Sequence, residues 1–98
     1  GCYDLNKKEY IRKIFTGEYE LTSLTGNITF LNNEYFVHTH ITISNNQFEG
    51  TGGHLFDAKI SATGEFKIEL LNTKINRKFS KDIGLNLWCL EREDNKNR

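Results

Sequence analysis

The segment Tyr35-Phe-Val-His-Thr-His-Ile-Thr-Ile-Ser44 decides the fold class, because apolar and polar side chains alternate along it. Successive side chains of a β-strand point to opposite faces of the sheet, so this period of two is typical of a half-buried strand. Asn45-Asn46 follows directly, and asparagine tolerates the positive φ angles of a tight hairpin turn. The segment therefore predicts an antiparallel strand that turns back on itself immediately after Ser44.

The same period of two recurs on both sides of this strand. We predict six further strands, at residues 18–24, 28–31, 47–52, 55–62, 65–71 and 85–91. Asn32-Asn33 and Thr63-Gly64 separate neighbouring segments as hairpin turns. Short strands joined by tight turns indicate a mainly β fold, in which an antiparallel sheet curls or closes into a small barrel.

A helical pattern precedes the strands. Asn6 and Glu9 stand in capping-box positions, and Gly17 provides a stop. The apolar side chains between them fall at helical spacing, at Tyr10, Ile11, Ile14 and Phe15. We therefore expect one N-terminal helix packed on the sheet, which makes the predicted fold mainly β of the α+β class.

The size and charge of the chain indicate one domain. Its 98 residues carry 13 basic and 13 acidic side chains, and 37% of the residues are hydrophobic. We predict a single domain over residues 1–98, with residues 1–5 as an anchor or linker and residues 92–98 as a frayed tail. The zero net charge argues against a nucleic-acid partner. We also expect a monomer.

Gly1-Cys2 is typical of a processed bacterial lipoprotein, in which the cysteine is acylated. Lipidation of Cys2 would anchor the domain in the cell envelope, on the periplasmic side or at the surface, without a spanning segment. A Cys2–Cys89 disulfide is the alternative in an oxidising compartment. The two interpretations exclude each other, because an acylated Cys2 sulfur cannot form a disulfide.

The histidines are the one candidate for a metal site. His38 and His40 lie two residues apart on the predicted central strand and share a face, and His54 is a candidate third ligand. The opposite face of that strand is more apolar, which predicts that both strand histidines face solvent. Nothing adjacent in sequence holds a further ligand in place. We therefore expect no bound metal and no other cofactor.

Two other segments are candidate binding surfaces. One is a basic run with an aromatic side chain, suited to an anionic membrane surface or an envelope protein, at Lys74, Arg77, Lys78, Phe79 and Lys81. The other is a candidate ligand-facing turn, or a structural bulge, at Gly50, Gly52, Gly53 and His54. Nucleophile elbows, phosphate-binding loops and zinc-protease motifs are absent from the sequence, so we expect no catalytic residues and no enzyme activity.

Residues 17–73 resemble the META domain family of small bacterial heat-shock-associated envelope proteins. The order of turn and core residues carries this resemblance, at Gly50, Phe56, Gly64, Leu70 and Thr73. Gly53-His54 stands where the family has Cys-Asn, and the chain after Thr73 is shorter than in the family. The resemblance implies a compact β-rich envelope domain without catalytic residues.

Three functional hypotheses result. The first is a non-enzymatic envelope lipoprotein domain that acts by binding, in stress tolerance or envelope maintenance. The second is a small secreted inhibitor or protein-interaction module. The third is a barrel-type carrier of a small apolar ligand, bound in an interior near Phe56, Phe66 and Trp88.

Overall fold

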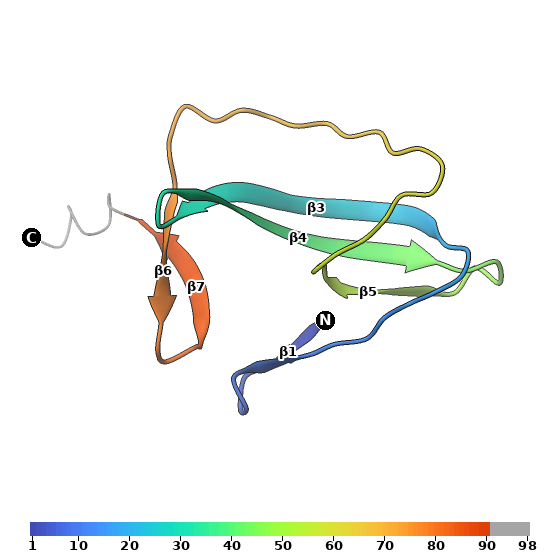
Figure 1. The fold of residues 1–98 in the computed structure, drawn as a ribbon, viewed down its shortest axis with the longest axis horizontal. Coiled ribbons are helices and arrows are strands. Elements are labelled where there is room, and N and C mark those ends of the chain that lie inside the picture. The colour runs from blue at the N-terminus through green and yellow to red at the C-terminus, as the bar shows by residue number, and fades with distance from the viewer. Residues whose placement is uncertain (91–98) are drawn as a thin grey trace, which may run out of the picture.

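The structure is a computed structural model and describes residues 1–90. It forms two sheets, a hairpin of β1 and β2 and a five-stranded sheet in the order β5-β4-β3-β6-β7 (Figure 1). The strands are β1 (Cys2–Asp4), β2 (Glu9–Ile11), β3 (Glu20–Leu31), β4 (Glu34–Ser44), β5 (Gly50–His54), β6 (Asn76–Ser80) and β7 (Leu85–Cys89). The predicted tail at residues 92–98 and the last residue of the predicted strand 85–91 lie outside the described residues.

The long β3–β4 hairpin dominates the five-stranded sheet. Asn32 and Asn33 form its two-residue turn with φ angles of 52° and 65°, which confirms the turn predicted there. The strand predicted at residues 35–44 is also confirmed, as β4. The two strands predicted at 18–24 and 28–31 are one continuous strand, because Gly26 pairs with Thr39 inside the β3–β4 ladder.

A five-residue loop, residues 45–49, connects β4 to β5. The Asn45 side chain organises it, since Oδ1 accepts hydrogen bonds from the backbone N–H groups of Gln47 and Glu49, each at 3.0 Å. Phe48 adopts the left-handed conformation with φ of 65°. The predicted two-residue turn at Asn45-Asn46 is therefore wrong, and β5 begins at Gly50.

The strand β6 lies within the basic run and was not predicted. It runs parallel to β3, with Phe30 opposite Asn76 and the Phe30 N–H donating to the Ile75 carbonyl at 2.9 Å. An antiparallel pairing then joins it to β7, which confirms the strand predicted at the end of the chain. The sheet is therefore mixed rather than wholly antiparallel.

The predicted N-terminal helix is wrong, since residues 1–90 contain no helix. Asp4 Oδ1 accepts the backbone N–H groups of Asn6 and Lys7 at 2.9 and 3.0 Å, which closes a turn between β1 and β2. Lys8 completes that turn with φ of 54°. The apolar residues have helical spacing, but they do not form a helix. The Asp4 turn and the pairing of β1 with β2 provide the backbone hydrogen bonds that a helix would otherwise supply.

Residues 55–75 form an irregular segment between β5 and β6, so the strands predicted at 55–62 and 65–71 are wrong. Figure 1 shows this segment running back along the length of β3 and β4. It returns the chain to the end of β3 where β6 pairs with Phe30. A strand requires a paired neighbour, and the alternating sequence here has none in the described structure.

The described strands do not close into a barrel, and no apolar side chain among them is fully buried. Thr29 is the one buried residue, at 2% exposure, whereas Trp88 is 45% exposed. The interior near Trp88, Phe56 and Phe66 that a barrel-type carrier requires is therefore not formed by residues 1–90. No helix in that range is long and apolar enough to span a membrane.

Candidate metal centre

Three histidines from β4 and β5 converge on one face of the sheet. His38 and His40 are two residues apart on β4 and so share a face, and His40 pairs directly with His54 of β5. The ring centroids lie 5.2 Å (His38–His40), 5.4 Å (His38–His54) and 5.7 Å (His40–His54) apart. One nitrogen from each ring lies within 4.8 Å of the other two. We call these three residues the histidine cluster.

The donors of the histidine cluster fit a transition-metal ion. Imidazole nitrogens bind zinc at about 2.0–2.1 Å, which places two tetrahedral ligands roughly 3.3 Å apart. Side-chain rotation would have to bring the nitrogens from the observed separations of up to 4.8 Å to that spacing. His54 Nδ1 is buried and has no hydrogen-bond partner. A buried nitrogen without a partner is costly, and a metal ion would satisfy it.

The N-terminal hairpin packs over one side of the cluster. The backbone of Gly1 pairs with that of His54, through hydrogen bonds of 2.7 Å and 2.9 Å. This places the ring of Tyr10 in β2 at 4.7 Å from the His54 ring, and Phe56 contacts the same imidazole, also at 4.7 Å. The His54 ring therefore packs against two aromatic rings, which also contact each other with their centroids 4.9 Å apart.

Arg77 of β6 lies beside His38 of the cluster. Its Nε donates to Thr29 Oγ1 at 2.6 Å, and its Nη1 donates to the Asn86 carbonyl at 2.8 Å. Its Nη2 donates to Asn27 Oδ1 at 3.1 Å and lies 3.5 Å from His38 Nδ1. The guanidinium thus connects β3, β6 and β7 to the cluster. The groups in residues 1–90 that accept its hydrogen bonds are all neutral.

Burial and neighbouring positive charges favour the neutral form of two of these histidines. Burial lowers the pKa of His38, and the charges of Arg77 and His40 lower it further. Burial also lowers the pKa of His54, with smaller contributions from the other two histidines, the N-terminal amino group and Arg12. Because a metal ligand must be the unprotonated imidazole, both shifts favour metal binding at neutral pH.

The same shifts predict how the stability of the metal-free protein depends on pH. The folded-state pKa values of His38 and His54 lie below their ordinary value of 6.5, so the unfolded chain binds protons first as the pH falls through about 6.5. The free energy of unfolding should therefore decrease between about pH 7.5 and about pH 5.5, as measured by urea unfolding in a chelator. A His38→Asn/His54→Asn variant should show a flatter pH dependence. An equal slope in both proteins would contradict the prediction.

The predicted exposure of the strand histidines is wrong for His38. His38 and His54 are half-buried, whereas Val37 and Tyr35, on the opposite face of β4, are 60% and 77% exposed. The turn length explains why His54, though named as a candidate third ligand, was not expected to lie opposite His40. A two-residue turn at Asn45-Asn46 would place Thr51 opposite His40, and the observed five-residue loop places His54 there.

The other candidate residues lie apart from one another. The basic run does not form one surface, because Arg77 points to the cluster and Lys74 lies over the Phe30 ring at 4.5 Å. Lys78 and Phe79 are exposed on β6, and Lys81 is exposed in the turn after it. Cys2 is an exposed free thiol in β1, and Cys89 is a free, half-buried thiol in β7.

The glycines predicted as a ligand-facing turn are part of a strand. Gly50, Gly52 and Gly53 all lie in β5 and pair with β4. A Cβ on Gly52 would overlap the Ile41 carbonyl oxygen, and one on Gly53 would lie 2.6 Å from the Gly1 carbonyl oxygen. Gly52 therefore allows β5 to pair closely with β4, and Gly53 allows the close approach of Gly1. Of the predicted turn, only His54 joins the histidine cluster.

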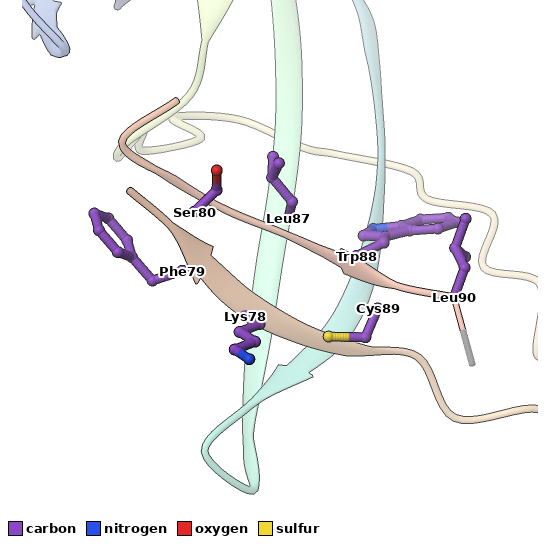
Figure 2. Close-up of a pocket in the computed structure, with 7 residues that line it drawn as sticks. All are labelled: Lys78, Phe79, Ser80, Leu87, Trp88, Cys89 and Leu90. Atoms are coloured by element: carbon purple, nitrogen blue, oxygen red, sulfur yellow. The ribbon is translucent and has the colours of Figure 1, made fainter. Parts of the chain in front are cut away.

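A shallow pocket lies on the β6–β7 hairpin, away from the cluster. Its volume is about 430 Å³, and Figure 2 shows Phe79 and Trp88 at opposite ends of it. It is lined by Lys78, Phe79, Ser80, Leu87, Trp88, Cys89 and Leu90. This pocket is open to solvent. The histidine cluster is the better candidate site, because three side chains that can bind a metal point to one place there.

The protein is therefore a mixed β-sheet whose adjacent strands β4 and β5 carry a candidate metal centre of three histidines. The sequence of residues 2–72 matches the Plants and Prokaryotes Conserved (PCC) domain, and the chain belongs to this family. No curated protein matches the chain.

Solved structures support the family assignment. A proposed DNA-binding protein from Bacteroides thetaiotaomicron is 34% identical, with a TM-score of 0.86 over 92% of this chain and 63% of that one. A metal-containing protein from Archaeoglobus fulgidus is 32% identical, with a TM-score of 0.72 over 90% of this chain and 62% of that one. A plant- and prokaryote-conserved protein from Pyrococcus horikoshii is 37% identical, with a TM-score of 0.70 over 90% of this chain and 61% of that one. The chain thus spans somewhat less than two thirds of these relatives.

These comparisons correct several predictions. The META resemblance is wrong, because residues 2–72 match the PCC domain and a solved plant- and prokaryote-conserved protein is 37% identical to the chain. The predicted lipoprotein and envelope role rested on that resemblance and on Gly1-Cys2, and the PCC assignment does not support it. The exclusion of nucleic acid is contradicted by the solved relative described as DNA-binding. Net charge is a poor guide here, since a local cluster of lysines can bind DNA on a neutral chain.

Proposed function

We propose that this chain is the metal-binding portion of a DNA-associated PCC-domain protein, and that it acts by binding rather than by catalysis. The convergence of His38, His40 and His54 carries the proposal, because three imidazole nitrogens already lie within 4.8 Å of one another. The metal-containing relative and the relative described as DNA-binding support its two halves.

The metal would be zinc or a similar borderline ion. Three neutral imidazoles suit Zn²⁺, Co²⁺ or Ni²⁺ and disfavour Mg²⁺ and Ca²⁺, which prefer oxygen ligands. When bound, such an ion supplies positive charge and an open coordination position. The chain itself contributes orientation: Tyr10 and Phe56 fix the His54 ring, and the β4–β5 register fixes His40 opposite it.

Metal titration of the full-length protein tests this half of the proposal. We expect one Zn²⁺ or Co²⁺ per chain by native mass spectrometry and calorimetry, and no comparable binding of Mg²⁺. The His38→Ala/His40→Ala variant removes two of three ligands and should bind neither ion. Identical weak binding by the wild-type protein and this variant would rule out the site.

Two exposed lysines on neighbouring turns are candidates for contacting DNA. Lys8 Nζ donates to the Lys81 backbone carbonyl at 3.1 Å, so the β1–β2 turn lies beside the β6–β7 turn. Each lysine that neutralises a phosphate releases counterions, which makes binding depend on salt.

The expected result is a gel shift of short duplex DNA by the full-length protein at low salt that weakens as salt rises. The Lys8→Gln/Lys81→Gln variant should reduce the slope of log affinity against log salt by about two. Lys59→Gln/Lys67→Gln removes the same charge from the exposed 55–75 segment and serves as the matched control. No shift at low salt, or equal slopes in both variants, would contradict DNA binding through this pair.

A further inference from the structure

The surroundings of the histidine cluster are positively charged. Its three ligands are neutral when they bind a metal, so a divalent ion retains its full charge of about two. Arg77 Nη2 lies 3.5 Å from His38 Nδ1, and Arg12 stacks on Phe56, which contacts the His54 ring. Two arginines therefore lie close to this centre.

Metal binding would release hydrogen-bond donors on Arg77. An arginine N–H always donates, so the contact from Nη2 requires a lone pair on His38 Nδ1. If Nδ1 binds the metal, that lone pair is used. If Nε2 binds it, Nδ1 carries the proton and becomes a donor. In both cases the hydrogen bond to Nη2 ends.

The guanidinium would then have two unused N–H groups. One is the N–H of Nη2 released by His38, and the other is the second N–H of Nη1, whose partner in residues 1–90 is the Asn86 carbonyl alone. The hydrogen bonds to Thr29 and Asn27 remain and keep Arg77 beside the cluster. A positioned guanidinium with free N–H groups on two nitrogens suits an oxyanion.

A second arginine lies near His54, whereas Arg77 lies near His38. The guanidinium carbon of Arg12 stands 3.7 Å from the centroid of the Phe56 ring, and Phe56 contacts the His54 ring. This stacking holds Arg12 near the cluster although its side chain is exposed. The two arginines come from opposite ends of the sequence and flank the same three histidines.

We infer that the metal ion in the histidine cluster binds a small oxyanion, a free carboxylate or phosphate group. One oxygen occupies the coordination position that three histidines leave open, and another accepts hydrogen bonds from Arg77. Arg12 adds a weaker attraction from the exposed side. A small ligand fits best, because His54 is half-buried and its Nδ1 is buried. This inference rests on the proposed metal site.

The full-length protein loaded with Co²⁺ tests the inference, because the visible bands of Co²⁺ respond to a change of ligand. Titration with acetate or inorganic phosphate should shift these bands with saturation. Arg77→Met should weaken the apparent anion affinity by about tenfold or more, since a charge-assisted hydrogen bond is lost. Arg12→Gln should weaken it severalfold, and Lys67→Gln should leave it unchanged.

Arg77 also links three strands, so Arg77→Lys is a second variant that keeps the charge but loses the forked donor. It should fold and bind the anions with an affinity between those of the wild-type protein and Arg77→Met. Failure of the wild-type protein to bind Co²⁺ would overturn the proposed metal site itself. Normal Co²⁺ binding with bands that ignore both anions, that respond equally in all variants, or that respond only to duplex DNA would overturn the oxyanion inference alone.

Discussion

Replacing His54 with alanine is expected to weaken zinc or cobalt binding on the order of a hundredfold or more. Loss of a residue that merely orients a ligand costs about 10–100-fold, and His54 is itself one of the three ligands. Its Nδ1 is the buried nitrogen that lacks a partner, and the rings of Tyr10 and Phe56 pack against its imidazole. Two histidines on one strand would remain, which is too few to hold an ion against water.

Calorimetric titration of the full-length protein and the variant measures this effect. The wild-type protein should also gain thermal stability from the metal, whereas the His54→Ala protein should not. Val37→Ala is the control, because Val37 lies beside His38 on β4 but points to the exposed opposite face. Equal affinities in the wild-type and His54→Ala proteins would mean that β5 contributes no ligand.

The sequence predicts the central hairpin well and the site poorly, for reasons that lie in particular residues. The alternation of residues 35–44 and the Asn32-Asn33 turn are local patterns, and local patterns define β4 and its turn correctly. The partner of His40 depends on how the chain returns after β4. That return depends on the Asn45 side chain, which stabilises a five-residue loop rather than a two-residue turn.

Other errors have similar physical origins. Tyr10 fits a helical pattern, but it packs against Tyr3 at 4.9 Å in the β1–β2 hairpin because Asp4 closes the turn between these strands. The strand β6 has no alternation to reveal it, since four of its five residues are polar. Its Arg77 reaches the cluster only through pairing with β3, a contact distant in sequence. Arg77 and the three histidines come together only through pairing between strands that are distant in sequence, and local sequence patterns do not predict such pairing.

The same close pairing makes Gly26 a position of large expected effect. Gly26 of β3 pairs with Thr39, the residue between His38 and His40. A Cβ at Gly26 would overlap the His38 carbonyl oxygen and lie 2.7 Å from Thr39 Cα. Backbone atoms cannot move aside as a flexible side chain can, so the two strands would have to separate. We expect Gly26→Val to lower the free energy of unfolding by about 3 kcal/mol.

The matched control for Gly26→Val is Gly50→Val, since Gly50 is also a strand glycine, and its added Cβ would meet nothing closer than the Ile43 carbonyl oxygen at 3.9 Å. Valine favours strands, so Gly50→Val should leave urea unfolding unchanged or slightly more stable. Separation of β3 from β4 would also displace His38 and His40, so Gly26→Val should bind metal more weakly even where it remains folded. Equal stability of the two variants would show that β3 and β4 do not approach each other this closely. The histidine cluster would then lack the close strand pairing that positions its β4 ligands.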